Sequence, residues 1–238
     1  MSSPEPGTAG SHRALRYAAT IAFGVFNAPF LVVSLYGGSR KARRALTERL
    51  DLPADALAGL GGWRADVGLL RLLTDHIERR KPETVVEFGS GASTLVIARA
   101  LERFVGAAAS FISFEHDDEF SRRTRERLAE HGCRADLRVA PLVPAPGGWP
   151  GKWYDHGALP ERIDLLVIDG PPWTIHPFTR GAAETLFGRI PPGGFVLLDD
   201  GARPGERVVA ARWRRRWPDF RFELVRSGSK GTLVAERR

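Results

Sequence analysis

The chain has 238 residues, enough for one large domain or two small ones with a buried core. Because 43% of the residues are hydrophobic and 26% are charged, the composition excludes wholesale disorder and low-complexity classes. The formal net charge of +7 favours anionic partners such as nucleic acid, phosphorylated substrates or acidic lipid, without choosing among them. Cys133 is the only cysteine, which excludes an internal disulfide framework and a cysteine-rich zinc module.

The first 39 residues differ from the rest of the chain. Residues 1–16 are predicted to form a disordered tail. Residues 17–39 contain no Asp, Glu, Lys or Arg, and about twenty apolar helical residues at ~1.5 Å each cross a hydrocarbon core of ~30 Å. We therefore predict a membrane-associated helix over 17–39, with a packed soluble helix and a cleaved signal peptide as the alternatives. Asn27 and Pro29 leave open whether this helix spans the bilayer or lies in one leaflet.

Basic side chains flank this segment and are denser on its C-terminal side, where Arg40, Lys41, Arg43 and Arg44 follow it. This asymmetry predicts that the remaining chain lies at the cytoplasmic face of the membrane, the inner membrane in a bacterium. If the helix is packed instead, the prediction is a cytoplasmic protein.

Residues 40–62 are predicted to be a basic and then Gly-rich connector, and residues 63–238 a single domain. A helix is predicted over 65–80, because Val67, Leu70, Leu73 and Ile77 follow a helical spacing. From Glu83 onward, short apolar runs alternate with helical segments at 93–104, 118–131, 177–189 and 206–216. The runs, which predict buried strands, are TVVEF, SFISFE, LRVA, IDLLVID and GFVLLD.

This alternation predicts an α/β fold with a parallel sheet and helices on both of its faces. At the C-terminus, FRFELVR and GTLVAE are separated by Ser-Gly-Ser-Lys, which predicts an antiparallel hairpin.

The sequence VVEFGSGAST, residues 85–94, is a buried strand that enters a Gly-rich turn and opens a helix. Gly89 and Gly91 permit a tight turn and a close approach of a ligand to the backbone. Glu87 disfavours a pyrophosphate there, and Thr94 replaces the third glycine of a dinucleotide fingerprint. A ligand with a cationic amino-acid end suits this turn better than NAD.

Acids follow several of the predicted strands. Glu115 and His116 end the second strand, at a distance from the turn where an acid accepts ribose hydroxyls. Asp169 ends the fourth strand, and Asp199 and Asp200 end the fifth. Since open α/β sheets bind ligands at the carboxyl ends of their strands, these acids form one constellation.

The motifs VVEFGSGAST, FISFEHD and LLVIDGPP resemble those of class I S-adenosylmethionine-dependent methyltransferases, over roughly residues 63–236. The chain looks closest to a bacterial subgroup related to catechol O-methyltransferase-like enzymes. The resemblance implies a Rossmann-like, mostly parallel seven-stranded sheet with an antiparallel last strand, and S-adenosylmethionine as the cofactor. The cofactor-binding residues that it implies are Glu87, Gly89, Ser90, Gly91, Ser93, Thr94, Glu115, His116 and Asp169.

By the same resemblance, Glu115 takes the ribose hydroxyls, His116 lies beside the adenine, and Asp169 lies near the sulfonium. We expect O-methylation of a small-molecule, sugar or lipid-linked acceptor, with Asp169 and Asp200 as catalytic acids that manage a proton. A non-catalytic or NAD-type nucleotide-binding protein on the same fold is the alternative. A nucleic-acid partner is not favoured, because no NPPY-like motif follows the fourth strand.

The sequence leaves open whether the chain binds a divalent metal such as Mg²⁺. In catechol-type enzymes, acids after the fourth and fifth strands bind magnesium, and here Asp169, Asp199 and Asp200 offer hard oxygen ligands. The chain departs from that pattern because Gly201 stands where an amide ligand often follows. It also has no lysine just after Asp169.

Aromatic residues gather in loops near the expected ligand face. Residues 146–161 contain GGWPGKWYDHG, and Trp63, Trp173 and His176 lie in other loops. These side chains predict a lid or an acceptor pocket, or else a cover over the edge of the sheet. The basic run RWRRRW at 212–217 is read as a solvated helix face with two buried indoles, or as a contact for phosphate or lipid headgroups.

Overall fold

The computed structural model describes residues 35–62, 65–226 and 228–238. The predicted tail, Trp63 and most of the predicted apolar helix at 17–39 lie outside these ranges. Within them, the structure contains no helix with the length and hydropathy that crossing a membrane requires.

A seven-stranded sheet forms the centre of the molecule, with the strand order β3-β2-β1-β6-β7-β9-β8. The first five strands in this order are parallel, whereas β9 is antiparallel to β7 and β8 is antiparallel to β9. The predicted mostly parallel sheet with an antiparallel C-terminal hairpin is therefore confirmed. The strands are β1 (Thr84–Phe88), β2 (Ser110–Glu115), β3 (Asp136–Val139), β6 (Leu165–Ile168), β7 (Phe195–Leu198), β8 (Phe220–Val225) and β9 (Thr232–Arg237).

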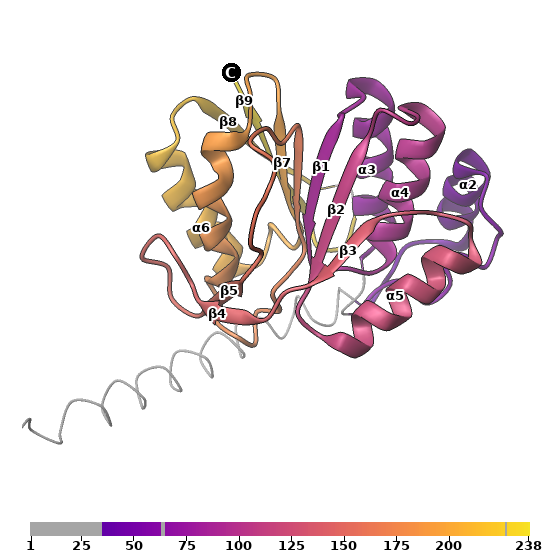
Figure 1. The fold of residues 1–238 in the computed structure, drawn as a ribbon, viewed down its shortest axis with the longest axis horizontal. Coiled ribbons are helices and arrows are strands. Elements are labelled where there is room, and N and C mark those ends of the chain that lie inside the picture. The colour runs from indigo at the N-terminus through magenta and orange to yellow at the C-terminus, as the bar shows by residue number, and fades with distance from the viewer. Residues whose placement is uncertain (1–34, 63–64, 227) are drawn as a thin grey trace, which may run out of the picture.

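Helices cover both faces of this sheet (Figure 1). Alternate strand residues point to opposite faces, so Val85 belongs to one buried cluster and Val86 to the other. The first face is covered by α2 (Arg40–Leu50), α3 (Val67–Arg80), α4 (Ala92–Phe104) and α5 (Asp118–Glu130). The second face is covered by the 3₁₀ helix η1 (Thr179–Arg189) and by α6 (Pro204–Arg216).

The segment predicted as a connector, residues 40–62, packs onto the domain. It forms α2, whose Leu46 and Leu50 are buried in the same cluster as α3 and α4. Leu57 and Leu60 continue this contact after the helix. The apolar positions of this segment are spaced among many charged residues, so its buried face is hidden in the sequence.

A two-stranded ribbon on the second face was not predicted. It consists of β4 (Leu142–Pro144) and β5 (Lys152–Tyr154), which pair antiparallel. Trp149 and Trp153, within the predicted aromatic loop, are buried against this face of the sheet. These two indoles therefore cover the sheet and do not line an acceptor pocket.

Candidate active site

The turn after β1 holds the ends of β1, β2 and β6 together. Gly89 donates its N–H to the carbonyl oxygen of Phe114, with N and O 2.9 Å apart. Gly89 adopts a φ of +96°, and a Cβ there would lie 2.5 Å from the backbone nitrogen of Gly170. A Cβ on Gly91 would meet nothing within 4 Å. One glycine thus permits backbone packing, and the other leaves the N-terminus of α4 open to a ligand.

Glu87 is fully buried below this turn. Its Oε2 accepts hydrogen bonds from the hydroxyls of Thr94 and Ser113, each with an oxygen–oxygen distance of 2.7 Å. Its Oε1 accepts no hydrogen bond from any residue that the structure describes. Burial raises the pKa of Glu87 to about 7 and outweighs the hydrogen bonds with Ser93, Ser113 and Thr94, which lower it. A carboxylate oxygen left in this condition suits a ligand ammonium group.

Glu115 joins the end of β2 to the Gly-rich turn. Its Oε2 lies 3.0 Å from the Ser90 nitrogen and 3.3 Å from the Ser90 Oγ, and accepts a hydrogen bond from each. Its Oε1 accepts hydrogen bonds from the backbone N–H groups of His116 and Asp117, with oxygen–nitrogen distances of 2.7 and 3.0 Å. Burial raises the pKa of Glu115, but His116 and these N–H groups outweigh burial and lower it. To take ribose hydroxyls, the carboxylate must exchange part of this set, so its predicted role stays a prediction.

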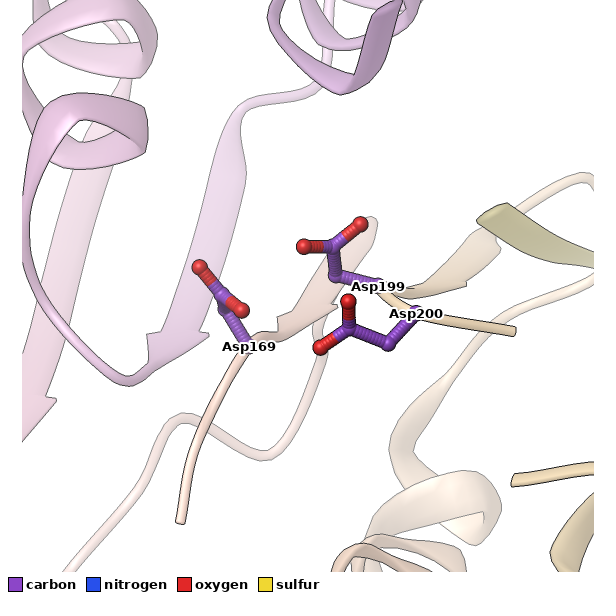
Figure 2. Close-up of side chains that lie close together, drawn as sticks. All are labelled: Asp169, Asp199 and Asp200. Carbon is purple, nitrogen blue, oxygen red and sulfur yellow. The ribbon is translucent and has the colours of Figure 1, made fainter. Parts of the chain in front are cut away.

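Three acids lie together at the ends of β6 and β7, and we call Asp169, Asp199 and Asp200 the acid cluster (Figure 2). One carboxylate oxygen from each lies within 4.8 Å of the others. Asp199 and Asp200 are each only 2% exposed. The predicted meeting of the acids at this edge of the sheet is therefore observed.

Arg180, from η1, is buried beside the acid cluster. Its Nη1 lies 3.1 Å from Oδ2 of Asp200 and 3.2 Å from the carbonyl oxygen of Asp199, and donates to both. Its Nε donates to the carbonyl oxygen of Pro171 at 3.1 Å. Its Nη2 lies 3.7 Å from Oδ1 of Asp169. One guanidinium thus ties the ends of β6 and β7 to η1.

Two further cations complete what we call the cation group, Arg180, Arg203 and Lys230. Arg203 Nη1 lies 2.8 Å from Oδ2 of Asp200. Lys230 Nζ, from the turn between β8 and β9, lies 3.7 Å from Oδ1 of Asp200 and 3.9 Å from Oδ2 of Asp199. None of these three cations belongs to a sequence motif, so the sequence does not predict them at the site.

The pKa values of the three acids are shifted in different directions, and the cation group lowers that of Asp200. Burial pushes the pKa of Asp200 upward, but Arg203, Arg180 and Lys230 outweigh burial and lower it. Burial raises the pKa of Asp199 well above its ordinary value, and the charges of Asp200 and Asp169 add to this effect. Burial also raises the pKa of Asp169, against the opposing charge of Arg180.

A cavity of about 350 Å³ connects the Gly-rich turn to the acid cluster. From the turn side it is lined by Ser90, Glu115 and His116, and from the acid side by Asp169 and Asp200. Tyr154, Trp173, Arg203 and Lys230 also line this cavity. Five of the predicted cofactor-binding residues thus border the same space as the predicted catalytic Asp200: Gly89, Ser90, Glu115, His116 and Asp169. The other four, Glu87, Gly91, Ser93 and Thr94, do not line it.

Trp173 and the basic run at 212–217 lie in different parts of the molecule. Trp173 lines the cavity, in agreement with a place near an acceptor. In the basic run of α6, Trp213 is fully buried and Arg212 lies over the ring of Trp149, 4.0 Å from its centroid. Arg216 pairs with the buried Glu184 at 2.7 Å. Part of this run therefore holds the β4–β5 ribbon to the second face.

Known proteins resemble the chain in sequence and in fold. Residues 86–201 match a family model described as a methyltransferase domain. A curated relative, protein-L-isoaspartate O-methyltransferase 1 from Polaromonas sp., is 24% identical over 144 residues, or 59% of this chain and 50% of that protein. The chain thus spans about half the length of the curated relative that it matches.

Solved structures match over more of the chain. The SAH-bound methyltransferase from Podospora anserina is 14% identical, has a TM-score of 0.56 and is covered over 100% of both chains. A putative caffeoyl-CoA O-methyltransferase from Staphylococcus aureus is 12% identical, with a TM-score of 0.55 over 84% of this chain and 93% of that one. These identities show the fold alone. Residues 86–201 are therefore similar to a methyltransferase domain, and the chain shares the fold of these solved methyltransferases.

Proposed function

We propose that the chain transfers a methyl group from S-adenosylmethionine to an oxygen atom of a small-molecule, sugar or lipid-linked acceptor. The observation that carries this proposal is the single cavity that joins the Gly-rich turn to the acid cluster. Two structural neighbours support the same chemistry: an O-methyltransferase from Streptomyces achromogenes in complex with SAM and an O-methyltransferase from Bacillus cereus in complex with SAH.

The Gly-rich turn after β1 fits the methionine end of S-adenosylmethionine. The buried Oε1 of Glu87, which no described residue donates to, suits an ammonium group. The open side of Gly91 and the start of α4 suit a carboxylate. When bound, the cofactor supplies an electrophilic methyl group on a sulfonium sulfur, which becomes a neutral thioether after transfer.

The acid side manages the proton of the acceptor hydroxyl. Asp169 lines the cavity, and burial raises its pKa, which brings this carboxylate closer to the range of a useful base. Asp200 is held by Arg180 and Arg203 and its pKa is lowered, so it is the weaker base. We therefore assign proton acceptance to Asp169 and a positioning role to Asp200.

We also propose that residues 17–39 attach the protein to a membrane, with the catalytic domain at the cytoplasmic face. The uncharged sequence of this segment and the basic residues that follow it support the proposal. A lipid-linked acceptor becomes accessible to the domain in that arrangement.

Binding and turnover test the proposal separately. We expect S-adenosylhomocysteine, the demethylated product, to bind wild-type protein in titration calorimetry. Asp169→Asn should lower methyl transfer by about 100-fold, the ordinary loss for a general base, and should weaken this binding by far less. Transfer is followed as label that moves from S-adenosylmethionine to a panel of phenols and sugars. Asp155→Asn, at an exposed position after β5, is the matched control.

Two results would contradict the proposal. Binding of NADH without binding of S-adenosylmethionine would favour the nucleotide-binding alternative. Cofactor binding with no transfer to any acceptor, in wild type as in Asp169→Asn, would favour a non-catalytic module.

A further inference from the structure

The acid cluster lies within a buried group of seven ionisable side chains with nearly balanced charge. The carboxylates are the acid cluster and Glu206, and the cations are Arg180, Arg203 and Lys230. With all seven ionised, four negative charges face three positive ones. A divalent cation added to this group would leave a buried excess of positive charge, which is costly. Without Lys230, the same cation would balance the group.

The Lys230 ammonium faces one carboxylate oxygen of Asp199 and one of Asp200. Oδ1 of Asp200 and Oδ2 of Asp199 are buried, and neither accepts a hydrogen bond from the described residues. Lys230 Nζ lies 3.7 Å from the first and 3.9 Å from the second. Because like charges repel strongly in a buried site, Lys230 and a divalent cation exclude each other here.

The backbone shows why this lysine is placed at the acid cluster. The backbone N–H of Gly201 donates to the carbonyl oxygen of Gly231 at 2.8 Å. The backbone N–H of Ala202 donates to the carbonyl oxygen of Lys230 at 3.2 Å. A Cβ at position 201 would lie 2.6 Å from the backbone nitrogen of Leu233. Residue 201 is therefore a glycine because the β8–β9 turn docks on it. The same contact leaves no room for an amide side chain at position 201 and places Lys230 beside the acid cluster.

We propose that the Lys230 ammonium takes the place of a divalent cation against Asp199 and Asp200, so that methyl transfer by this chain needs no metal. This inference rests on the proposed methyltransferase function. Lys230 is 4% exposed and lines the cavity, where its N–H groups orient an acceptor oxygen as a metal would. The residues present do not fit a resident divalent ion.

Manganese binding tests the inference without any turnover. Mn²⁺ is titrated into the full chain and the free ion is measured by electron paramagnetic resonance. We expect wild type to show no specific site, and Lys230→Met to bind one Mn²⁺ at least about tenfold more tightly, because Oδ2 of Asp199 and Oδ1 of Asp200 lose the cation that faces them. Lys230→Arg keeps the charge and should resemble wild type. Lys152→Met, at an exposed position on β5, is the control.

Either of two outcomes would overturn the inference: one Mn²⁺ site in the wild type that Asp199→Asn removes, or no gain of affinity in folded Lys230→Met. If Lys230→Met fails to fold, as judged by circular dichroism, the wild type and Lys230→Arg still decide. Binding of S-adenosylhomocysteine is measured on the same samples. A wild type that binds neither Mn²⁺ nor this product counts against the proposed function and leaves the metal result intact.

Discussion

Glu87 carries an ionisable group in a place that disfavours its charge. Its folded-state pKa, raised to about 7 from an ordinary 4.5 by burial, means that the folded protein prefers the protonated form. The stability that Glu87 contributes is thus fully present below pH 4.5 and is lost as the pH rises through 7. We expect Glu87→Gln to match wild type near pH 5 and to exceed its unfolding free energy by roughly 2–3 kcal/mol at pH 8.

Urea unfolding at the two pH values measures this difference. Exposed Glu83→Gln is the control and should change little between them. The same Glu87→Gln protein should bind S-adenosylmethionine more weakly, since an amide replaces the carboxylate that faces the ligand ammonium. A stability difference that does not grow with pH would contradict the prediction.

Tyr154 offers a second test at a single atom. Its ring packs against Phe88 with centroids 5.3 Å apart, and its hydroxyl is buried without a partner among the described residues. Burial raises the pKa of Tyr154 well above its ordinary value, so the hydroxyl stays a neutral donor. Since Tyr154 lines the cavity beside His116 and Gly170, we expect the hydroxyl to donate to the cofactor.

Tyr154→Phe should therefore weaken S-adenosylhomocysteine binding by about 3–10-fold, the effect of one hydrogen bond. The melting temperature of the unliganded protein should stay the same or rise, because an unpaired buried hydroxyl is removed. Calorimetry and thermal melting measure the two effects, with exposed Tyr36→Phe as control. Unchanged affinity would show that the hydroxyl does not reach the cofactor.

At the site, motif residues could be predicted from the sequence and their cationic partners could not. Glu87 and Asp169 each lie at or next to the end of a strand, so the parallel sheet alone brings them to one edge. Arg180 and Lys230 reach the acid cluster from η1 and from the β8–β9 turn. Their arrival depends on how those elements dock, which no local pattern encodes.

At the scale of elements, the inner parallel strands β1, β2, β6 and β7 were predictable because they are mostly buried apolar runs of four to six residues. The β4–β5 ribbon was not, since its two strands have three residues each and contain Pro144 and Lys152. Tertiary contacts stabilise it: Trp149 Nε1 donates to the buried Glu184 at 2.6 Å. The 177–189 segment was predicted as a helix and forms the 3₁₀ helix η1, in which two glycines disfavour the α form.

Helix α2 gives a prediction about the boundary of the domain. Leu50 is 0% exposed and packs in the cluster formed by α3 and α4. We expect Leu50→Ala to lower the unfolding free energy by about 2–5 kcal/mol, because it leaves a cavity in a shared core. Denaturant unfolding should still show one transition. Lys41→Ala, on the exposed side of α2, should change stability little, and an equally small effect of Leu50→Ala would restore the connector interpretation.

For the whole molecule, the placement of charge on α2 bears on the membrane proposal. The first turn of this helix has no acidic residue and instead begins with Arg40, Lys41 and Arg43. Cations at a helix N-terminus oppose the helix dipole, so this arrangement costs stability in isolation. An anionic surface next to these side chains offsets that cost. The positions that follow the uncharged segment are thus suited to acidic lipid headgroups.

The described domain from residue 35 onward contains both buried clusters and every proposed site residue. Removal of residues 1–34 should therefore leave the thermal midpoint and S-adenosylhomocysteine binding nearly unchanged, and should release the protein from membranes into the soluble fraction. A cut at residue 45 would instead remove half of α2 and destabilise the domain.

In the full chain, Arg40→Glu with Lys41→Glu should weaken binding to anionic vesicles by about 1 kcal/mol or more per residue, and high salt should reduce the difference. Vesicle flotation and fractionation measure these effects, and full-length protein that is soluble at low salt without detergent would leave a packed helix over 17–39 as the better explanation.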